Sequence, residues 1–123
     1  MSTSKPRICV DFDGVLNTYT GWAGPENLFE PRDGALDFVK ELSKNFNVVI
    51  FSTRDPQLLM NWMEKNGFTD FIVDITNEKV PAMVYIDDRA YYFNGDYSQA
   101  LSDISEHSKK YPWYQRTKTK EKA

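Results

Sequence analysis

The stretch that decides the fold is Ile8-Cys9-Val10-Asp11-Phe12-Asp13-Gly14, residues 8–14. A short apolar run bounded by turn residues predicts a buried β-strand over residues 7–12. The carboxylates of Asp11 and Asp13 stand two residues apart, so in an extended chain they point to the same side. At about 4 Å they repel by roughly 4 kcal/mol where the effective dielectric constant is about 20. Protonation of one acid, a bound cation or full solvation would relieve that repulsion, and the last is compatible with an ordinary turn.

The rest of the chain alternates apolar runs of strand length with helical patterns. Further strands are predicted at 48–51, 71–73 and 83–86, and helices at 33–45, 56 to about 67, and 97–109. Asp33 and Asp55 are the expected N-caps of the first two helices. This alternation predicts an α/β fold, a Rossmann-like three-layer sandwich with a central parallel sheet and helices on both faces.

Length and composition limit the class of protein. A chain of 123 residues suits one domain, predicted over residues 1–110, followed by a basic aromatic tail at 111–123. No apolar run approaches the roughly 20 residues that span a bilayer, and the N-terminus lacks an apolar signal core. The single Cys9 lies in a strand pattern and is expected to be a buried, reduced thiol, so we predict a cytoplasmic protein.

Charge is unevenly distributed along the chain. Residues 110–123 hold five basic residues and one acidic residue, so their net charge is +4, and the preceding residues carry −7 of the total of −3. An acidic body of this kind is not typical of a general nucleic-acid-binding protein. The short basic tail leaves a contact with phosphates open.

Polar residues gather at the ends of three predicted strands. Asp11 and Asp13 end the first strand, Ser52, Thr53 and Arg54 follow the second, and Asp87 and Asp88 follow the last. The carboxyl ends of parallel strands share one edge of a sheet, and ligands bind at that edge. Unrelated turns would scatter such residues over both edges. The pattern therefore predicts a site.

The chemistry of these residues favours a hard cation and phosphate. Asp11, Asp13, Asp87 and Asp88 offer oxygen ligands only, which suits Mg²⁺ with its waters and a phosphate. A carboxylate can act as nucleophile toward phosphorus, and a second one can act as general acid and base. The following residues are candidates for phosphate binding: Ser52, Thr53 and Lys79. Arg54 would either contact the substrate or pair with Asp55.

Four segments together resemble the motifs of the haloacid dehalogenase superfamily of phosphotransferases. Asp11-Phe12-Asp13-Gly14-Val15-Leu16 is similar to its first motif, and Ser52 after an apolar strand is similar to its second. Lys79 matches the lysine of the third motif. Asp87-Asp88 resembles the acidic fourth motif. The resemblance covers about residues 7–93, with all four segments in the family's order.

The resemblance implies a role for each residue. Asp11 would be the nucleophile and a Mg²⁺ ligand, and Asp13 the general acid and base with its backbone carbonyl on the metal. Lys79 would hold phosphate oxygens together with Ser52, or with Thr53 in its place. Asp87 and Asp88 would complete the metal site. An Asp at the second position of the first motif is typical of the phosphatases of the family.

The same resemblance implies a minimal member without a cap domain. The gap at 17–32 and the gap at 53–78 are both too short for the inserted domain that many members carry. An open site suits a bulky substrate, or a small one enclosed by a partner subunit, so a homo-oligomer is one option. Aromatic residues of the first gap, Trp22 and Phe29, would form a flap or pack on the sheet.

The sequence therefore predicts a Mg²⁺-dependent phosphomonoesterase that forms an aspartyl phosphate on Asp11. A narrower alternative is a phosphatase for nucleotides or polynucleotide ends, which the basic tail favours and the acidic body disfavours. An alternative of another class is a phospho-accepting receiver domain, whose acceptor would have to be Asp74. A binding module with a relict site has little support, because every expected side chain is present. Tyr91, Tyr92 and Phe93 are expected to lie in the core.

Overall fold

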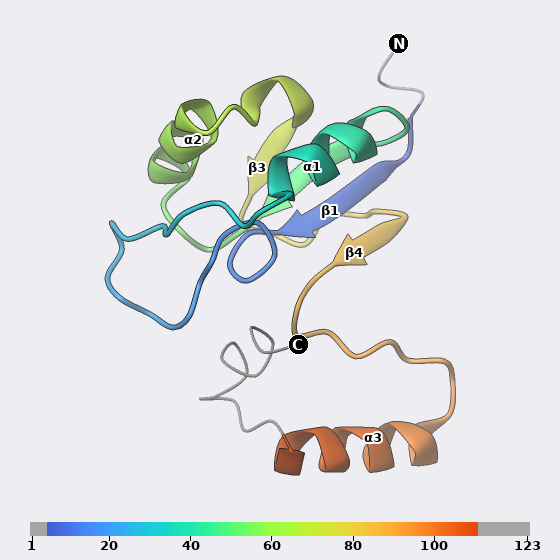
Figure 1. Cartoon of the computed structure of the whole chain (residues 1–123). Coiled ribbons are helices and arrows are strands. Elements are labelled where there is room, and N and C mark those ends of the chain that lie inside the picture. Colours follow the sequence, from blue (N-terminus) through green and yellow to red (C-terminus); the bar gives the residue numbers. More distant parts are fainter. Residues whose placement is uncertain (1–4, 111–123) are drawn as a thin grey trace. The chain divides into compact units, whose positions relative to one another are not determined.

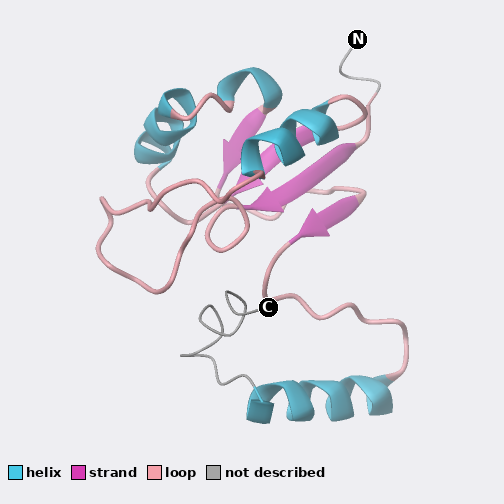
Figure 2. Ribbon diagram, viewed as in Figure 1, coloured by secondary structure: helices cyan, strands magenta, loops and turns pink. Residues whose placement is uncertain are grey.

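The computed structural model describes residues 5–110 of the chain, shown in Figures 1 and 2. The chain divides after Asp88 into two compact units. The division falls within the predicted catalytic domain of residues 1–110, directly after the acidic pair Asp87-Asp88. The predicted tail at 111–123 lies outside the described residues.

The first unit is built on a parallel sheet of four strands. The strands are β1 (Arg7–Asp11), β2 (Asn47–Phe51), β3 (Asp74–Thr76) and β4 (Val84–Ile86). Their order across the sheet is β3-β2-β1-β4, and every neighbouring pair is parallel. The α/β class and the parallel sheet predicted from the sequence are confirmed. Their carboxyl ends lie along one edge.

Helices α1 (Ala35–Ser43) and α2 (Pro56–Lys65) cover the same face of this sheet (Figure 1). Val39 of α1 and Met63 of α2 are fully buried in one cluster with Val10 of β1 and Ile50 of β2. The connections β1-α1-β2 and β2-α2-β3 run in one direction across the sheet, and right-handed crossovers in one direction place their helices on one side. The helices of the first unit thus form a single layer, whereas the sequence predicted helices on both faces.

The connection from β3 to β4 returns across the sheet without a helix. The Tyr85 hydroxyl donates to the Val80 carbonyl at 2.7 Å, and Arg7 Nη1 donates to the Pro81 carbonyl at 2.8 Å. The register pairs Tyr85 with Cys9. Ile8, Val10 and Ile86 belong to the core under the helices, and side chains alternate along a strand, so Tyr85 and Cys9 lie on the opposite face. Cys9 is buried there and reduced, as expected.

The third strand begins three residues later than predicted. Phe71 ends a 3₁₀ turn (Thr69–Phe71), and β3 runs over Asp74–Thr76, so the strand predicted at 71–73 is wrong. Two residues of the apolar triplet, Phe71 and Ile72, pack against the core from outside the sheet, while Val73 is 56% exposed. The Val73 N–H donates to the Val48 carbonyl at 2.8 Å and brings the chain into the sheet.

One of the two predicted helix caps is confirmed. The Asp55 carboxylate accepts from the Gln57 N–H at 3.2 Å at the start of α2, with Pro56 at the first position. Asp33 does not cap α1, because Gly34 is the N-cap residue with a left-handed φ of 84° and no side-chain bond. A glycine adopts that conformation without strain and takes the place of a polar cap.

The second unit contains helix α3 (Tyr97–Lys110), close to the helix predicted at 97–109. The Asp96 carboxylate accepts from the Gln99 N–H at 3.0 Å and caps its start. Tyr91, Tyr92 and Phe93 are 40%, 88% and 47% exposed, so the prediction that they lie in the core is wrong.

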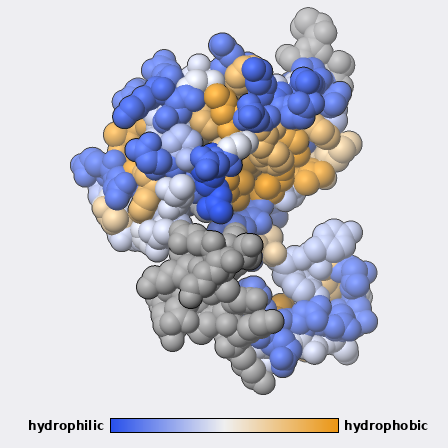
Figure 3. Space-filling model, viewed as in Figure 1, coloured by the Kyte–Doolittle hydropathy of each residue, from blue (hydrophilic) through white to orange (hydrophobic). Residues whose placement is uncertain are grey.

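The surface of the described residues is mixed. Figure 3 shows part of the apolar surface, and exposed large apolar side chains of the first unit include Phe38, Met83 and Val84. None of the helices within residues 5–110 has the length and apolar character needed to cross a membrane.

Candidate active site

Three carboxylates meet at the carboxyl edge of the sheet. Asp11 ends β1, and Asp87 and Asp88 follow β4 directly. One oxygen from each of the three residues lies within 4.8 Å of the others. Strand pairing causes this meeting, because Val10 is aligned with Ile86 and the residues that follow both leave the sheet at the same level.

This position is the point at which the chain changes direction in the sheet. From β1 the chain proceeds to β2 and β3 on one side, and β4 then lies on the other side of β1. In open parallel sheets, ligands bind outside the carboxyl ends of the strands at such a switch point. The three carboxylates therefore occupy the place where this fold favours a ligand site.

The electrostatics of the cluster are unfavourable without a cation. Burial, followed by the charges of Asp87, Asp88 and Asp13, raises the pKa of the Asp11 carboxyl to about 7 from an ordinary value of 3.8. Oxygen ligands so close together are the donor set of a hard divalent cation. A bound cation would offset the repulsion, so the residues present fit the Mg²⁺ predicted from the sequence.

The raised pKa of Asp11 predicts that the stability of the metal-free protein, measured in the presence of a chelator, depends on pH. A folded pKa of about 7 above an unfolded value of 3.8 means that the folded state binds more protons between these values. The contribution of Asp11 to stability is therefore fully present below pH 4 and is lost as the pH rises through 7. We expect the free energy of unfolding to fall by about 2 kcal/mol between pH 5 and pH 8, after allowance for solvent screening.

Urea unfolding in EDTA at pH 5 and pH 8 measures this effect. The Asp11→Asn variant serves as control, because it keeps the shape of the side chain and cannot ionise. The wild-type protein should lose more stability than the variant between the two pH values. Parallel losses in the two proteins would contradict the raised pKa.

Asp13 lies beside this cluster and is held by two partners. Arg54 Nε donates to both Asp13 carboxylate oxygens, at 3.1 and 2.9 Å, and Asn17 Nδ2 donates to Oδ1 at 2.9 Å. The side chain of Arg54 is 3% exposed and that of Asp13 is 27% exposed, so the ion pair is largely buried. Arg54 thus pairs with Asp13, whereas the sequence offered Asp55 as its partner. The three-carboxylate cluster does not include Asp13.

Asn17 is a residue of the site that the sequence reasoning missed. It is fully buried, and its side-chain amide donates to Asp13 and to the Leu28 carbonyl. Its Oδ1 accepts from the Gly14 N–H at 2.9 Å. Asn side chains often bond the backbone of their own turn, and an Asn four residues after Asp13 was the available signal.

Gly14 is required at its position for two reasons. Its φ of 84° is left-handed, and a Cβ placed there would overlap the carboxylate of Asp88. The left-handed φ would strain any other residue, and a Cβ would also push the Asp88 carboxylate aside, so this path of the loop after β1 favours glycine. The glycine of the Asp-x-Asp-Gly stretch thus brings the chain that carries Asp13 against Asp88.

The residues predicted to bind phosphate lie in different settings. The side chain of Ser52 is buried at the end of β2, and its hydroxyl accepts from the Arg54 N–H at 3.1 Å, while Thr53 is exposed. The ammonium of Lys79 lies 4.8 Å from the centre of the Tyr85 ring. Within the described residues, Lys79 forms no ion pair with the three-carboxylate cluster.

The flap residues of the loop between Asn17 and Pro31 divide between the two predicted roles. The Phe29 ring packs edge-on against Tyr19, and the Phe29 carbonyl accepts from Trp62 Nε1 at 2.8 Å. Trp22 is 66% exposed, and its ring centre lies 5.2 Å from Cζ of Arg54. Phe29 therefore packs inward, and Trp22 covers the buried arginine.

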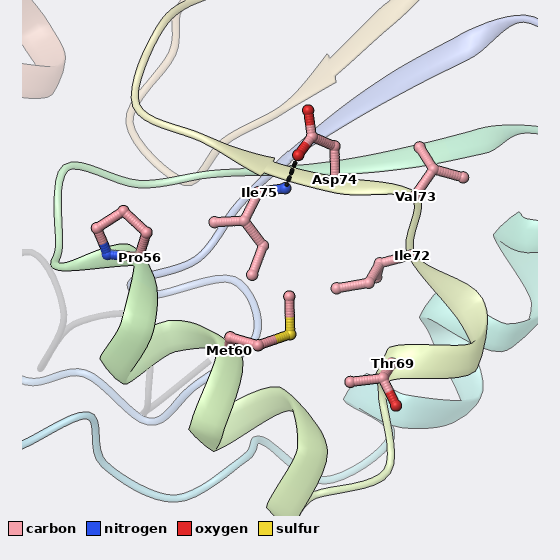
Figure 4. A pocket seen from close by; sticks show the side chains of 7 residues that line it. All are labelled: Pro56, Met60, Thr69, Ile72, Val73, Asp74 and Ile75. Atoms are coloured by element: carbon pink, nitrogen blue, oxygen red, sulfur yellow. Dashed lines mark hydrogen bonds between the residues drawn. The ribbon is translucent and has the colours of Figure 1, made fainter.

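Asp74, the acceptor that a receiver domain would need, lies away from this edge. It is the first residue of β3 and pairs with Val49, two residues before the end of β2. Figure 4 shows it beside an apolar pocket between α2 and β3, into which Met60, Ile72 and Ile75 project. Its carboxylate accepts from the Ile75 N–H at 2.8 Å. This placement disfavours the receiver alternative.

Comparison of the chain with models of protein families, with curated proteins and with solved structures gave no match.

Proposed function

We propose that this protein is a Mg²⁺-dependent phosphomonoesterase of the haloacid dehalogenase type, acting through an aspartyl phosphate on Asp11. The observation that carries the proposal is the meeting of Asp11 with Asp87 and Asp88 at the switch point of a parallel sheet, next to Asp13. Two acids with separate surroundings suit the two roles of nucleophile and general acid–base.

Asp11 is the proposed nucleophile. Its carboxylate attacks phosphorus, the bond from phosphorus to the ester oxygen breaks, and the phosphoryl group is carried on Asp11. Asp13 enters this step in its protonated form and gives its proton to the departing oxygen, so the first product leaves as an alcohol and Asp13 becomes the carboxylate that pairs with Arg54. Asp13 then takes a proton from water as that water attacks phosphorus, which releases inorganic phosphate and restores Asp11.

The metal would be held by Asp11, Asp87 and Asp88, with the backbone carbonyl of Asp13 as the further ligand that the family resemblance implies. Mg²⁺ when bound would supply positive charge next to the phosphoryl oxygens. The close passage of Gly14 past Asp88 supports this arrangement, because it keeps Asp13 beside the three acids.

Ser52 and Lys79 are the proposed ligands of the phosphoryl oxygens, with Thr53 as the alternative to Ser52. Ser52 follows β2 at the same edge as Asp11, since Asp11 pairs with Phe51. Lys79 lies on the connection that precedes β4, and its side chain would have to leave the Tyr85 ring to reach phosphate. The described residues contain no inserted domain in either gap, which supports a member without a cap.

The proposal predicts Mg²⁺-dependent hydrolysis of phosphate monoesters. Release of inorganic phosphate is measured across sugar phosphates, nucleotides, oligonucleotides with phosphorylated ends and phosphopeptides, with Mg²⁺ or with EDTA. We expect turnover of at least one class in Mg²⁺ and a loss of at least about 100-fold in EDTA. Equal rates in the two conditions, or no turnover of any class, would overturn the proposed function.

A further inference from the structure

The guanidinium of Arg54 has more hydrogen-bonding capacity than the described residues use. Its Nε is bonded to Asp13, but Nη1 and Nη2 are buried and have no hydrogen-bond partner among residues 5–110. A buried donor without a partner costs free energy, and a charged donor costs more than a neutral one. These two nitrogens therefore call for an acceptor that is not among the described residues.

The position of these nitrogens relative to Asp13 indicates which part of a substrate they face. In the proposed reaction Asp13 protonates the departing oxygen, so it stands on the leaving-group side of the phosphoryl group. Arg54 is bonded to Asp13 and forms no bond to the three-carboxylate cluster within the described residues. If Asp13 has this role, the guanidinium bonded to it would face the leaving group rather than the transferred phosphoryl group.

The chemistry of the site selects an oxyanion. A guanidinium presents its N–H groups in a planar fork that matches a carboxylate or a phosphate. The single positive charge of the guanidinium is paired with Asp13 through Nε. The N–H groups of Nη1 and Nη2 remain for a second anionic group. The aromatic rings of Tyr19 and Trp22 have their centres 6.0 and 5.2 Å from Cζ, where an aromatic ring attracts a cation.

The cover over these nitrogens can be removed at low cost. Trp22 is already 66% exposed, so an outward rotation of its side chain exposes little additional apolar surface to water. Gly21 and Gly24 lie on either side of it in the chain and have φ angles of 143° and 95°, which glycine adopts without strain. Such glycines let a short loop segment open and close.

We propose that Arg54 is a specificity-determining residue that binds a second anionic group, a carboxylate or a phosphate, on the leaving group of the substrate, and that Trp22 covers it until that group binds. This inference rests on the proposed function, because the roles of Asp11 and Asp13 define the leaving-group side. The substrate class is then a phosphomonoester whose alcohol carries an anion close to the ester oxygen.

Two pairs of esters test the contact, and each pair differs only in the second anion. 3-Phosphoglycerate is compared with glycerol 3-phosphate, and thymidine 3′,5′-bisphosphate with thymidine 3′-phosphate, so that the arms separate a carboxylate from a phosphate. We expect kcat/KM for loss of the shared phosphate to be at least about tenfold higher for the member with the second anionic group, in at least one pair. Equal values in both pairs would overturn the inference.

The ratio of the two kcat/KM values within a pair also distinguishes a contact of Arg54 with the substrate from a purely structural role. The Arg54→Lys variant disturbs Asp13 for both members alike, so a purely positioning role leaves the ratio unchanged. We expect the ratio to fall toward one, because lysine lacks the fork. Arg7→Lys, at the opposite end of β1, is the matched control and should keep the wild-type ratio.

Binding separates failure of the contact from failure of the proposed function. Calorimetry with the Asp11→Asn variant in Mg²⁺ measures the affinity for the same esters without turnover. Selective binding that depends on Arg54, with no hydrolysis in the wild type, would retain the contact and overturn the function. Hydrolysis without selectivity would do the reverse, and neither binding nor hydrolysis would overturn both.

Discussion

Replacing Asp11 by Asn is expected to lower kcat for phosphate ester hydrolysis by about 10⁴-fold or more, because an amide is a poor nucleophile toward phosphorus. The measurement is release of inorganic phosphate under single-turnover conditions with the best ester of the panel. Electrophilic help from the remaining residues cannot replace the covalent step. The expected loss is therefore larger than for any other single substitution at the site.

The variant also has to be folded for this result to count. Asp11→Asn removes one charge from the three-carboxylate cluster, so we expect it to be at least as stable as the wild type at pH 8. Circular dichroism and urea unfolding measure this. Asp37→Asn, on the exposed side of α1, is a matched control that should keep full activity. Residual activity within tenfold of the wild type in a folded Asp11→Asn protein would exclude Asp11 as nucleophile.

Most strands and helices of the first unit can be predicted from the local pattern of apolar and polar residues in the sequence. The strands β1 and β2 are continuous apolar runs, because their central residues are buried on both faces of the sheet, and such runs are visible in the sequence. The edge strand β3 is different: Asp74 and Thr76 are polar, and the apolar residues before them pack outside the sheet. Apolar character predicts which residues are buried. At the edge strand β3, Phe71 and Ile72 pack against the core but lie before the residues that pair with the neighbouring strand.

The positions of the site residues along the sheet edge were predictable, and their pairings were not. Parallel strands fix where Asp11, Asp87 and Ser52 emerge, so their approach follows from the order of elements. The choice of Asp13 rather than Asp55 as the partner of Arg54 joins residues 41 positions apart. That choice depends on the path of the loop after β1, which Gly14 and Asn17 determine. No periodicity in the sequence reports such a path.

Removing the carboxylate of Asp13 is expected to destabilise the protein by about 3 kcal/mol, because it leaves the charge of Arg54 buried without an acceptor. The side chain of Arg54 is 3% exposed, and Nη1 and Nη2 have no partner in the part of the chain that the structure describes, so in Asp13→Ala none of these residues would accept from the guanidinium. The estimate is at the lower end for a buried pair because Asp13 itself is 27% exposed. Urea unfolding at pH 7 measures the loss.

The matched variants separate the burial of charge from the loss of packing. Asp13→Asn keeps an oxygen that accepts from Arg54 Nε, so we expect a smaller loss than for Asp13→Ala. Arg54→Met removes the charge and keeps an apolar chain against Tyr19 and Trp22. In the double variant Asp13→Ala/Arg54→Met no buried charge remains, and most of the lost stability should return.

The double-mutant cycle decides whether the ion pair exists in solution. A coupling free energy of at least about 1.5 kcal/mol between the two positions is expected for a buried, doubly bonded pair. Additive effects would mean that Arg54 reaches solvent when Asp13 is absent, so that the Trp22 cover opens in the free protein. In that case the guanidinium would be bonded to water before a substrate arrives, and the gain from a second anion on the substrate would shrink accordingly. The coupling energy and the selectivity between paired esters are therefore expected to rise and fall together.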